Sequence, residues 1–170
     1  MTVPMNDGVS QDGAMLRPFV ASDLEILFLQ QADPVANLMA HFPARDHLDF
    51  AEQWREKILS NPDITARIIE VSGQVAGNIV SWQQDNSQWI GYWLGRAFWG
   101  KGIASRALAQ FLPLIAIRPI YANVYPLNIG SRRVLEKNGF VLWRPLVEAA
   151  AEERGDHTVD ELLDCWYRLD

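Results

Sequence analysis

Residues 95–102 read GRAFWGKG, a glycine-rich stretch between one segment typical of a strand and another typical of a helix. The preceding stretch, QWIGYWL at 88–94, is apolar and aromatic, as expected for a strand. In the following stretch, 103–112, apolar residues recur at helical spacing, and Pro113 is expected to end or kink that helix. The sequence therefore predicts a strand, a tight turn and a helix in direct succession.

The rest of the chain supplies elements of both kinds. Strands are expected at 14–19, 65–71, 75–82, 88–94, 119–124, 140–146 and 158–169, and helices at 22–31, 45–59, 103–112 and 129–137. Ser22 and Glu25 have the spacing of a capping box at the start of the first helix. Because a helix lies between the strands at 88–94 and 119–124, these two can pair in parallel. We expect an α+β fold with a mixed sheet.

Length and composition indicate one domain, at residues 14–170, after a flexible polar tail at 1–13. The acidic stretch 147–157 is expected to be a mobile loop. No apolar run reaches about 18 residues, so no membrane partner is expected. The single cysteine, Cys165, alternates with apolar residues of a strand and should face the core. One cysteine and no secretory signal indicate a cytoplasmic protein.

Charge is distributed unevenly along the chain. The formal net charge is −6, which argues against nucleic acid as a partner. Between residues 96 and 137, however, seven residues are basic and only Glu136 is acidic. A block of one sign beside a glycine loop suggests that an anion binds there.

Three phosphate-binding loops are compatible in part with GRAFWGKG. An ATP-binding loop requires Ser or Thr at position 102, where this chain has glycine, and a dinucleotide loop requires glycine at position 105, where it has serine. The third possibility needs no metal: Gly100 and Gly102 permit a tight turn, and the unpaired N–H groups of the following helix bind a diphosphate. Lys101 or Arg106 would add positive charge. A plain connection that uses glycine for its geometry is equally compatible with the loop alone.

Two sequence blocks resemble one known family. WGKGIASRAL at 99–108 resembles the acetyl-CoA loop of the GNAT superfamily of N-acetyltransferases, whose pattern is Q/R-x-x-G-x-G/A, with Trp99 at the first position instead of Gln or Arg. NIGSRRVLEKNGF at 128–140 is similar to a later motif of the family, and LRPFVASDLEILF to its opening strand and helix. The resemblance covers residues 14–170 and is closest to the RimJ/RimL-like branch, in which a Trp at that position is familiar.

This resemblance implies the GNAT fold, a mixed central sheet with splayed parallel strands flanked by helices. It implies that acetyl-CoA lies in the gap between these strands, without a metal, and that Gly91 and Gly95 allow a bulge or close approach. Backbone groups near Leu94 and Arg96 would hold the pantetheine arm. The full set of residues expected to bind the cofactor is Leu94, Arg96, Trp99, Gly100, Lys101, Gly102, Ile103, Ala104, Asn128 and Ser131.

The implied activity is transfer of an acetyl group from acetyl-CoA to a primary amine by direct attack. The acceptor partner would be a protein N-terminus or a small molecule. The Leu94 N–H is the candidate for polarising the acetyl carbonyl. The tyrosine acid of many family members is replaced here by Leu135, so Ser131 is the candidate acid, or else it only supports its helix. Asn128 would bond the cofactor, cap the helix, or do both.

Other features leave alternatives open. The general base is not identifiable, although Glu25, Asp46, Glu52, Glu161, Tyr121 and Tyr125 are candidates, and Trp82, Trp89 and Trp93 are candidates to line a substrate channel. The three histidines lack the spacing of a zinc site, and Cys165 lacks the partners of a nucleophile. A CoA-binding sensor without turnover, an ATP-binding protein and a homodimer are further alternatives.

Overall fold

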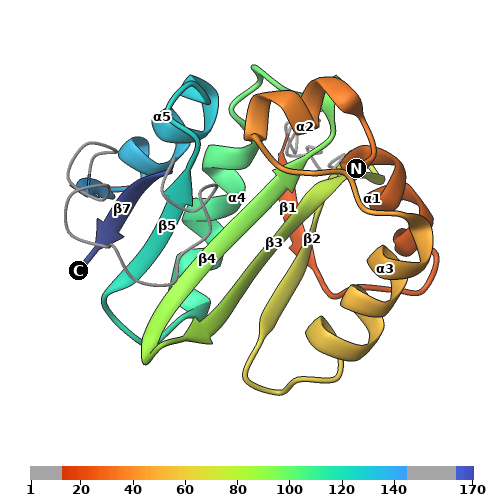
Figure 1. The fold of residues 1–170 in the computed structure, drawn as a ribbon, viewed down its shortest axis with the longest axis horizontal. Coiled ribbons are helices and arrows are strands. Elements are labelled where there is room, and N and C mark those ends of the chain that lie inside the picture. Colours follow the sequence, from red (N-terminus) through yellow and green to blue (C-terminus); the bar gives the residue numbers. More distant parts are fainter. Residues whose placement is uncertain (1–12, 145–163) are drawn as a thin grey trace, which may run out of the picture.

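The computed structural model describes residues 13–144 and 164–170, and the strands within them form one sheet (Figure 1). The order across this seven-stranded sheet is β1-β2-β3-β4-β5-β7-β6. The strands are β1 (Ala14–Arg17), β2 (Thr65–Val71), β3 (Gln74–Gln84), β4 (Ser87–Leu94), β5 (Ile120–Val124), β6 (Val141–Arg144) and β7 (Cys165–Leu169). Neighbouring strands are antiparallel except β4 and β5, which are parallel. This confirms the predicted α+β fold with a mixed sheet.

Some predictions lie on residues outside the described part of the chain. These are the flexible tail, apart from Gly13, the mobile acidic loop at 147–157, and the first part of the strand predicted at 158–169. Within the described residues, no helix is both long enough and apolar enough to cross a membrane. Cys165 is a free, buried cysteine, as its alternation predicted.

The helices differ from the predicted set in two places. They are α1 (Asp23–Gln31), α2 (Pro34–Ala40), α3 (His47–Glu52), α4 (Ile103–Phe111) and α5 (Ile129–Lys137). The segment predicted as one helix at 45–59 is α3 followed by a π-helix, Gln53–Ile58. Helix α2 was not predicted, although Asp33 accepts a hydrogen bond from the Val35 N–H and Pro34 occupies the first turn, which together form a recognisable start signal.

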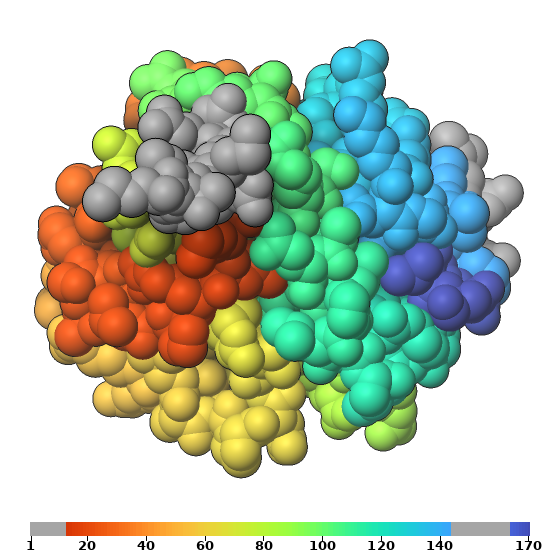
Figure 2. All heavy atoms as spheres, turned by 180° about the vertical axis from the view of Figure 1, so that it is seen from behind, coloured from red at the N-terminus to blue at the C-terminus, as the bar shows by residue number. Residues whose placement is uncertain are grey.

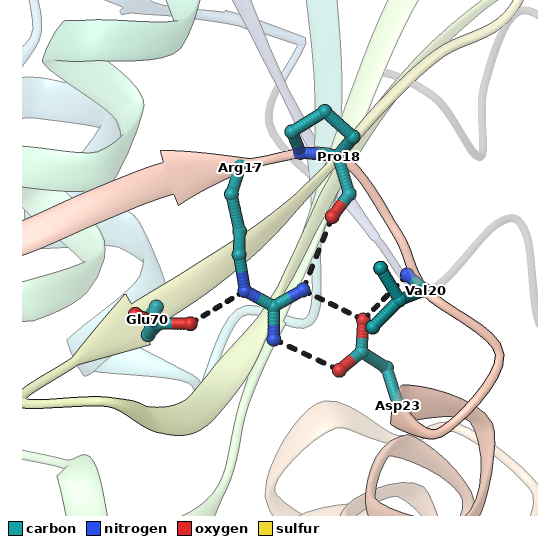
Figure 3. A network of polar contacts seen from close by, with 5 residues as sticks. All are labelled: Arg17, Pro18, Val20, Asp23 and Glu70. Carbon is teal, nitrogen blue, oxygen red and sulfur yellow. Dashed lines mark hydrogen bonds and ion pairs between the residues drawn. The ribbon is translucent and has the colours of Figure 1, made fainter.

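The predicted capping box at Ser22 is wrong, because the Ser22 side chain makes no cap hydrogen bond. Asp23 instead turns inward, where its carboxylate accepts two hydrogen bonds of 2.8 Å from the Arg17 guanidinium and one from the Val20 N–H (Figure 3). Arg17 also pairs with Glu70 on β2. Arg17 therefore joins β1 to the start of α1 through Asp23 and to β2 through Glu70.

Each face of the sheet has its own apolar core. On one face, α4 contributes Ile103, Ala107, Leu108 and Phe111 to a cluster with β-strand residues such as Ile79 and Ile120. Figure 2 shows this side, where α4 lies between β1 and α5. On the other face, α1, α3 and the π-helix pack Leu27, Phe50 and Trp54 against Ile68. The sheet is thus a layer between two groups of helices.

The parallel strands β4 and β5 are paired over a short length only. Their ladder consists of Gln88 with Ile120 and Trp89 with Tyr121. Beyond these pairs, β5 continues beside β7, and β4 continues beside β3 (Figure 1). The two strands therefore separate toward their carboxyl ends, which confirms the predicted splay.

Candidate functional site

The separation of β4 from β5 leaves backbone groups of β4 without a neighbouring strand. The Gly95 N–H donates to the Ala76 carbonyl on β3 at 2.8 Å. Because successive residues of a strand direct their N–H groups to opposite edges, the N–H groups of Tyr92 and Leu94 point toward the gap. This is the edge at which the sequence placed a cofactor arm and the Leu94 donor.

Trp99 fixes the peptide at the end of β4. Its indole N–H donates to the Leu94 carbonyl at 2.8 Å, across a single turn of 3-10 helix, Arg96–Phe98. An indole N–H is a donor only, so this contact orients the carbonyl and with it the peptide plane. Trp99, which differs from the Gln or Arg of the sequence pattern, thus holds the backbone at the end of β4 beside the gap.

The glycine loop ends in a helix start that has no side-chain cap. Gly100 and Gly102 have φ of +72° and +71°, a conformation that favours glycine. Gly102 is the N-cap of α4 and provides no capping side chain, whereas α2, α3 and α5 are capped by Asp33, Asp46 and Asn128. The first N–H groups of α4 have no partner within the helix, so they can bind an anion.

These N–H groups border a cavity of about 510 Å³, here called the loop cavity. It is lined by residues of the loop, α4, α5, α2 and the end of β4, including Leu94, Trp99, Gly100, Gly102, Ile103, Ala104, Asn128 and Ser131. Its charged lining residues are Arg133 and Lys137. Helix α5 thus supplies the positive charge that the sequence assigned to the loop.

Three basic side chains of the loop region are held by protein groups. Arg96 forms a 2.8 Å ion pair with Asp33, and the Lys101 ammonium donates to the Ala97 carbonyl at 3.0 Å. The Arg106 guanidinium stays at the loop, where it donates to the Lys101 carbonyl at 3.1 Å. None of these three residues lines the loop cavity.

The glycines of the strands differ from expectation. A Cβ at Gly91 would lie 3.3 Å from the Trp82 ring, and one at Gly95 would lie 2.9 Å from the Gln30 amide. Both glycines make room for protein side chains, so their predicted role in a close approach of cofactor is not supported. Among the strand glycines, sequence reasoning missed Gly77, where a Cβ would collide with the Trp93 carbonyl. An isolated glycine in a strand pattern was the available signal.

Ser131 lies at the gap and contacts Tyr92 of β4. The Tyr92 hydroxyl is 2.8 Å from the Ser131 Oγ and 3.0 Å from the Ser131 carbonyl oxygen. The Ser131 N–H donates to the Asn128 side chain at 3.1 Å, which confirms Asn128 as the helix cap. Burial raises the pKa of Tyr92 well above its ordinary value, so its hydroxyl stays protonated. Sequence reasoning did not identify Tyr92, which is 39 residues from Ser131.

A second cavity, of about 610 Å³, passes through the sheet and is here called the through-sheet cavity. On one face of the sheet it is lined by Val80, which packs against the cluster of α1 and α3, and by Trp82 and Trp93, which strand alternation puts on the same face. On the other face it is lined by Ile90 and Tyr92 of β4 and by Ser131 of α5. Residues of both faces can meet in one cavity because β4 and β5 have separated. The two cavities share Ala40, Tyr92, Trp93, Asn128 and Ser131, and these residues mark their junction.

The candidate bases proposed from sequence do not gather at this junction. Glu25 pairs with His47 on the surface, Asp46 caps α3, and Glu52 is exposed. None of these three lines the through-sheet cavity, and Glu161 is outside the described residues. Of the tyrosines, Tyr125 lines it and Tyr121 does not, whereas of the tryptophans Trp82 and Trp93 line it and Trp89 does not.

Among the described residues, no group of three His, Cys, Asp or Glu is arranged to hold a metal ion. The residues around the loop cavity instead suit a ligand with phosphate groups. Open N–H groups, two cations on α5 and glycines that leave space are the features that a diphosphate requires. The cavity therefore fits the diphosphate of acetyl-CoA.

The sequence matches the acetyltransferase (GNAT) domain over residues 14–141, and the chain belongs to this family. It is therefore an acyl-CoA-dependent acetyltransferase whose acetyl donor is acetyl-CoA. A search of curated proteins finds no match.

Several solved structures share this fold. The RimL acetyltransferase of ribosomal protein L7/L12, in complex with coenzyme A, has a TM-score of 0.71 at 20% identity, covering 95% of this chain and 96% of that one. RimJ of Mycobacterium smegmatis has a TM-score of 0.66 at 22% identity, covering 94% and 82%. The aminoglycoside enzyme AAC(6')-Ib with ribostamycin and coenzyme A has a TM-score of 0.69 at 19% identity, covering 92% of each chain.

Proposed function

We propose that the chain transfers the acetyl group of acetyl-CoA to a primary amine by direct attack in a ternary complex. The observation that carries this proposal is the junction of two cavities at Tyr92, Asn128 and Ser131. One cavity has an anion-binding helix start, and the other opens on the opposite face of the sheet. A donor and an acceptor that enter from the two sides would meet within the gap.

The donor would be held mainly by backbone groups. The N–H groups at the start of α4 would bind its diphosphate, with Arg133 and Lys137 on α5 adding positive charge. Its thioester supplies an acyl carbon that is already activated toward a neutral amine. No protein nucleophile is then required, in agreement with the burial of Cys165 in the core.

The end of β4 would position and polarise the carbonyl. The Leu94 N–H points into the gap, and the Trp99 indole holds the Leu94 carbonyl in place. A fixed N–H donor that faces developing negative charge lowers the barrier without reorganising. Leu94 is therefore proposed as a catalytic residue through its N–H. Trp99 is proposed to hold the next peptide, from Leu94 to Gly95, and so to restrain Leu94 from its carboxyl side.

As the amine nitrogen bonds to the acetyl carbon and the C–S bond breaks, Ser131 is proposed to give its hydroxyl proton to the departing sulfur and to regain, through water, the proton that the nitrogen loses. Tyr92 is its positioning residue. A tyrosine hydroxyl has one hydrogen, which Tyr92 can direct to the Ser131 carbonyl or to the Ser131 Oγ. In the second arrangement the serine hydrogen is free to point at the sulfur. The exchange needs only rotation of two hydroxyl groups that are already in contact.

Two other activities have less support. An ATP-binding protein would need a hydroxyl at position 102 and a carboxylate to hold magnesium. Residue 102 is glycine, and no Asp or Glu among the described residues lines the loop cavity. A sensor that binds CoA without turnover would not require the second cavity that meets the first at Ser131. We also propose a cytoplasmic location, because a free cysteine such as Cys165 and the use of acetyl-CoA both suit that reducing compartment.

Steady-state kinetics of Ser131→Ala and Tyr92→Phe test this proposal. Release of free thiol from acetyl-CoA would be followed with a panel of amines, and the acetylated product identified by mass spectrometry. We expect Ser131→Ala to lower kcat by about 100-fold or more, with KM for acetyl-CoA nearly unchanged. Tyr92→Phe should lower kcat by roughly 10-fold, because Ser131 remains but is less well oriented. Full activity of Ser131→Ala would refute the role of Ser131 as proton donor. If no amine caused release of thiol, the CoA-binding sensor would be the better-supported function.

A further inference from the structure

We infer that the through-sheet cavity accepts an amine with one ammonium group and a flat apolar body, and that this body stacks on the indole of Trp82. This inference rests on the proposed function, since it names the class of acceptor for the same site. Its basis is the aromatic surface of the cavity and the charge of its lining side chains.

The indole of Trp82 lies across the neighbouring strand. Val80 and Gly91 are partners across β3 and β4, and the Trp82 ring would be 3.3 Å from any Cβ at Gly91. Because Gly91 has no side chain, the ring can lie over β4 instead of standing away from it. Trp82 is half-buried and lines the cavity, so it offers an aromatic surface close to the strand that carries Tyr92.

Further aromatic rings line the same cavity. Phe42 and Trp93 have ring centroids 5.9 Å apart at an interplanar angle of 61°, and His41 is stacked on Tyr125 at 4.7 Å and 18°. These residues come from the segment directly after α2, from β4 and from the residue that follows β5. A cavity with rings on several sides favours an acceptor with a flat apolar body, since ring contacts add to the gain from burial.

The charge of the cavity suits a single ammonium group. Among the described residues, its charged lining side chains are Asp63, Asp164 and Arg45, which leaves one net negative charge. The Asp164 carboxylate accepts a hydrogen bond from Asn123, and the Arg45 guanidinium lies 5.1 Å from the Phe42 ring centroid. Because Arg45 offsets one of the two carboxylates, a single ammonium group matches the net charge of the lining, and each further ammonium group would leave an excess of positive charge.

The test compares amines and variants under the same conditions. The amines are 2-phenylethylamine (one ammonium and a flat ring), ethylamine (one ammonium, no ring), spermidine, kanamycin and a short peptide with a free N-terminus. For the unmodified protein we expect kcat/KM for 2-phenylethylamine to exceed that for each other amine at least 10-fold. Trp82→Ala should lower kcat/KM for 2-phenylethylamine by 10- to 100-fold through KM, while ethylamine changes less than 2-fold. Trp143→Ala, on β6 and outside the cavity, is the matched control and should change neither.

A binding measurement separates this inference from the proposed function. The affinity of 2-phenylethylamine for the complex of protein and CoA would be measured by calorimetry, which requires no turnover. Trp82-dependent binding supports the inference even where no amine is acetylated, and that result would overturn the proposed function alone. Preferred turnover of spermidine, kanamycin or the peptide, or an unchanged KM in Trp82→Ala, overturns the inference and leaves the acetyltransferase intact.

Discussion

Substitution of Gly102 by valine tests the diphosphate site, and Gly73 provides a matched control. Both glycines have positive φ, +71° at Gly102 and +76° at Gly73. Gly73 lies in the exposed turn between β2 and β3, where a Cβ would meet no atom within 4 Å. The two substitutions impose the same backbone strain, but only one of them does so at the start of α4.

The effect on stability should be similar for the two variants. A residue with a Cβ in the left-handed region costs about 1–2 kcal/mol, and the β-branch of valine favours the upper end of this range. For a chain of this length such a loss lowers Tm by about 4–8 °C. At Gly102 the Cβ would also lie 3.0 Å from an Arg106 guanidinium nitrogen, at the end of a flexible side chain that can move.

The effect on affinity should differ strongly. Relief of strain at residue 102 rotates the peptide that precedes Ile103 and turns N–H groups away from the diphosphate. Each hydrogen bond to a charged group contributes about 1.5–3 kcal/mol, so the loss of one raises Kd for CoA about 10- to 100-fold. The loss of two would abolish measurable binding.

Calorimetric titration of CoA into each variant, with Tm measured in parallel, gives both quantities. We expect Gly102→Val to bind at least 10-fold more weakly than Gly73→Val at comparable Tm. Equal affinity of the two variants would refute the placement of the diphosphate at α4. Equal weakening in both would show that strain anywhere in the fold lowers affinity, which would also contradict the argument.

Three further predictions follow from single contacts. Arg17 lowers the pKa of Asp23 below its ordinary value, so the pair stabilises the fold above about pH 4, and this stabilisation is lost as the pH falls through the lowered pKa. Asp23→Asn should lower the free energy of unfolding by about 3 kcal/mol at pH 7. Urea unfolding at several pH values should also show a weaker loss of stability in acid for this variant than for the unmodified protein. Trp99→Phe removes the donor to the Leu94 carbonyl and should lower kcat about 2- to 10-fold with little change in KM for acetyl-CoA, measured by thiol release; unchanged kcat would count against this positioning role. Asn128→Ala removes a helix cap and should lower Tm by about 2–4 °C in a thermal melt, and no shift would mean that water replaces the cap.

Sequence reasoning succeeded where a feature depends on residues close together in the chain. The strand, tight turn and helix around GRAFWGKG and the cap at Asn128 appear as predicted. Each is decided by φ preference or by a hydrogen bond within a few residues, which the sequence displays directly. Asp33 and Pro34 displayed the same kind of signal for α2, and that helix could have been predicted.

Sequence reasoning failed where contacts between different elements decide the arrangement. Ser22 has the right spacing for a cap but makes no cap hydrogen bond, and the neighbouring Asp23 pairs with Arg17 of β1. Gly91 and Gly95 suggested space for a cofactor, but Trp82 and Gln30 occupy that space. The side chain that occupies the space beside a glycine depends on how neighbouring strands are aligned, and this alignment cannot be read from the sequence.

The amino-acid order alone determined the glycine turn, the uncapped start of α4 and the serine at position 131, because these are properties of short stretches. Tertiary structure decided that the Tyr92 hydroxyl meets Ser131 and that two cavities join there. The physical reason is the short ladder between β4 and β5: once the strands diverge, side chains from opposite faces share one space.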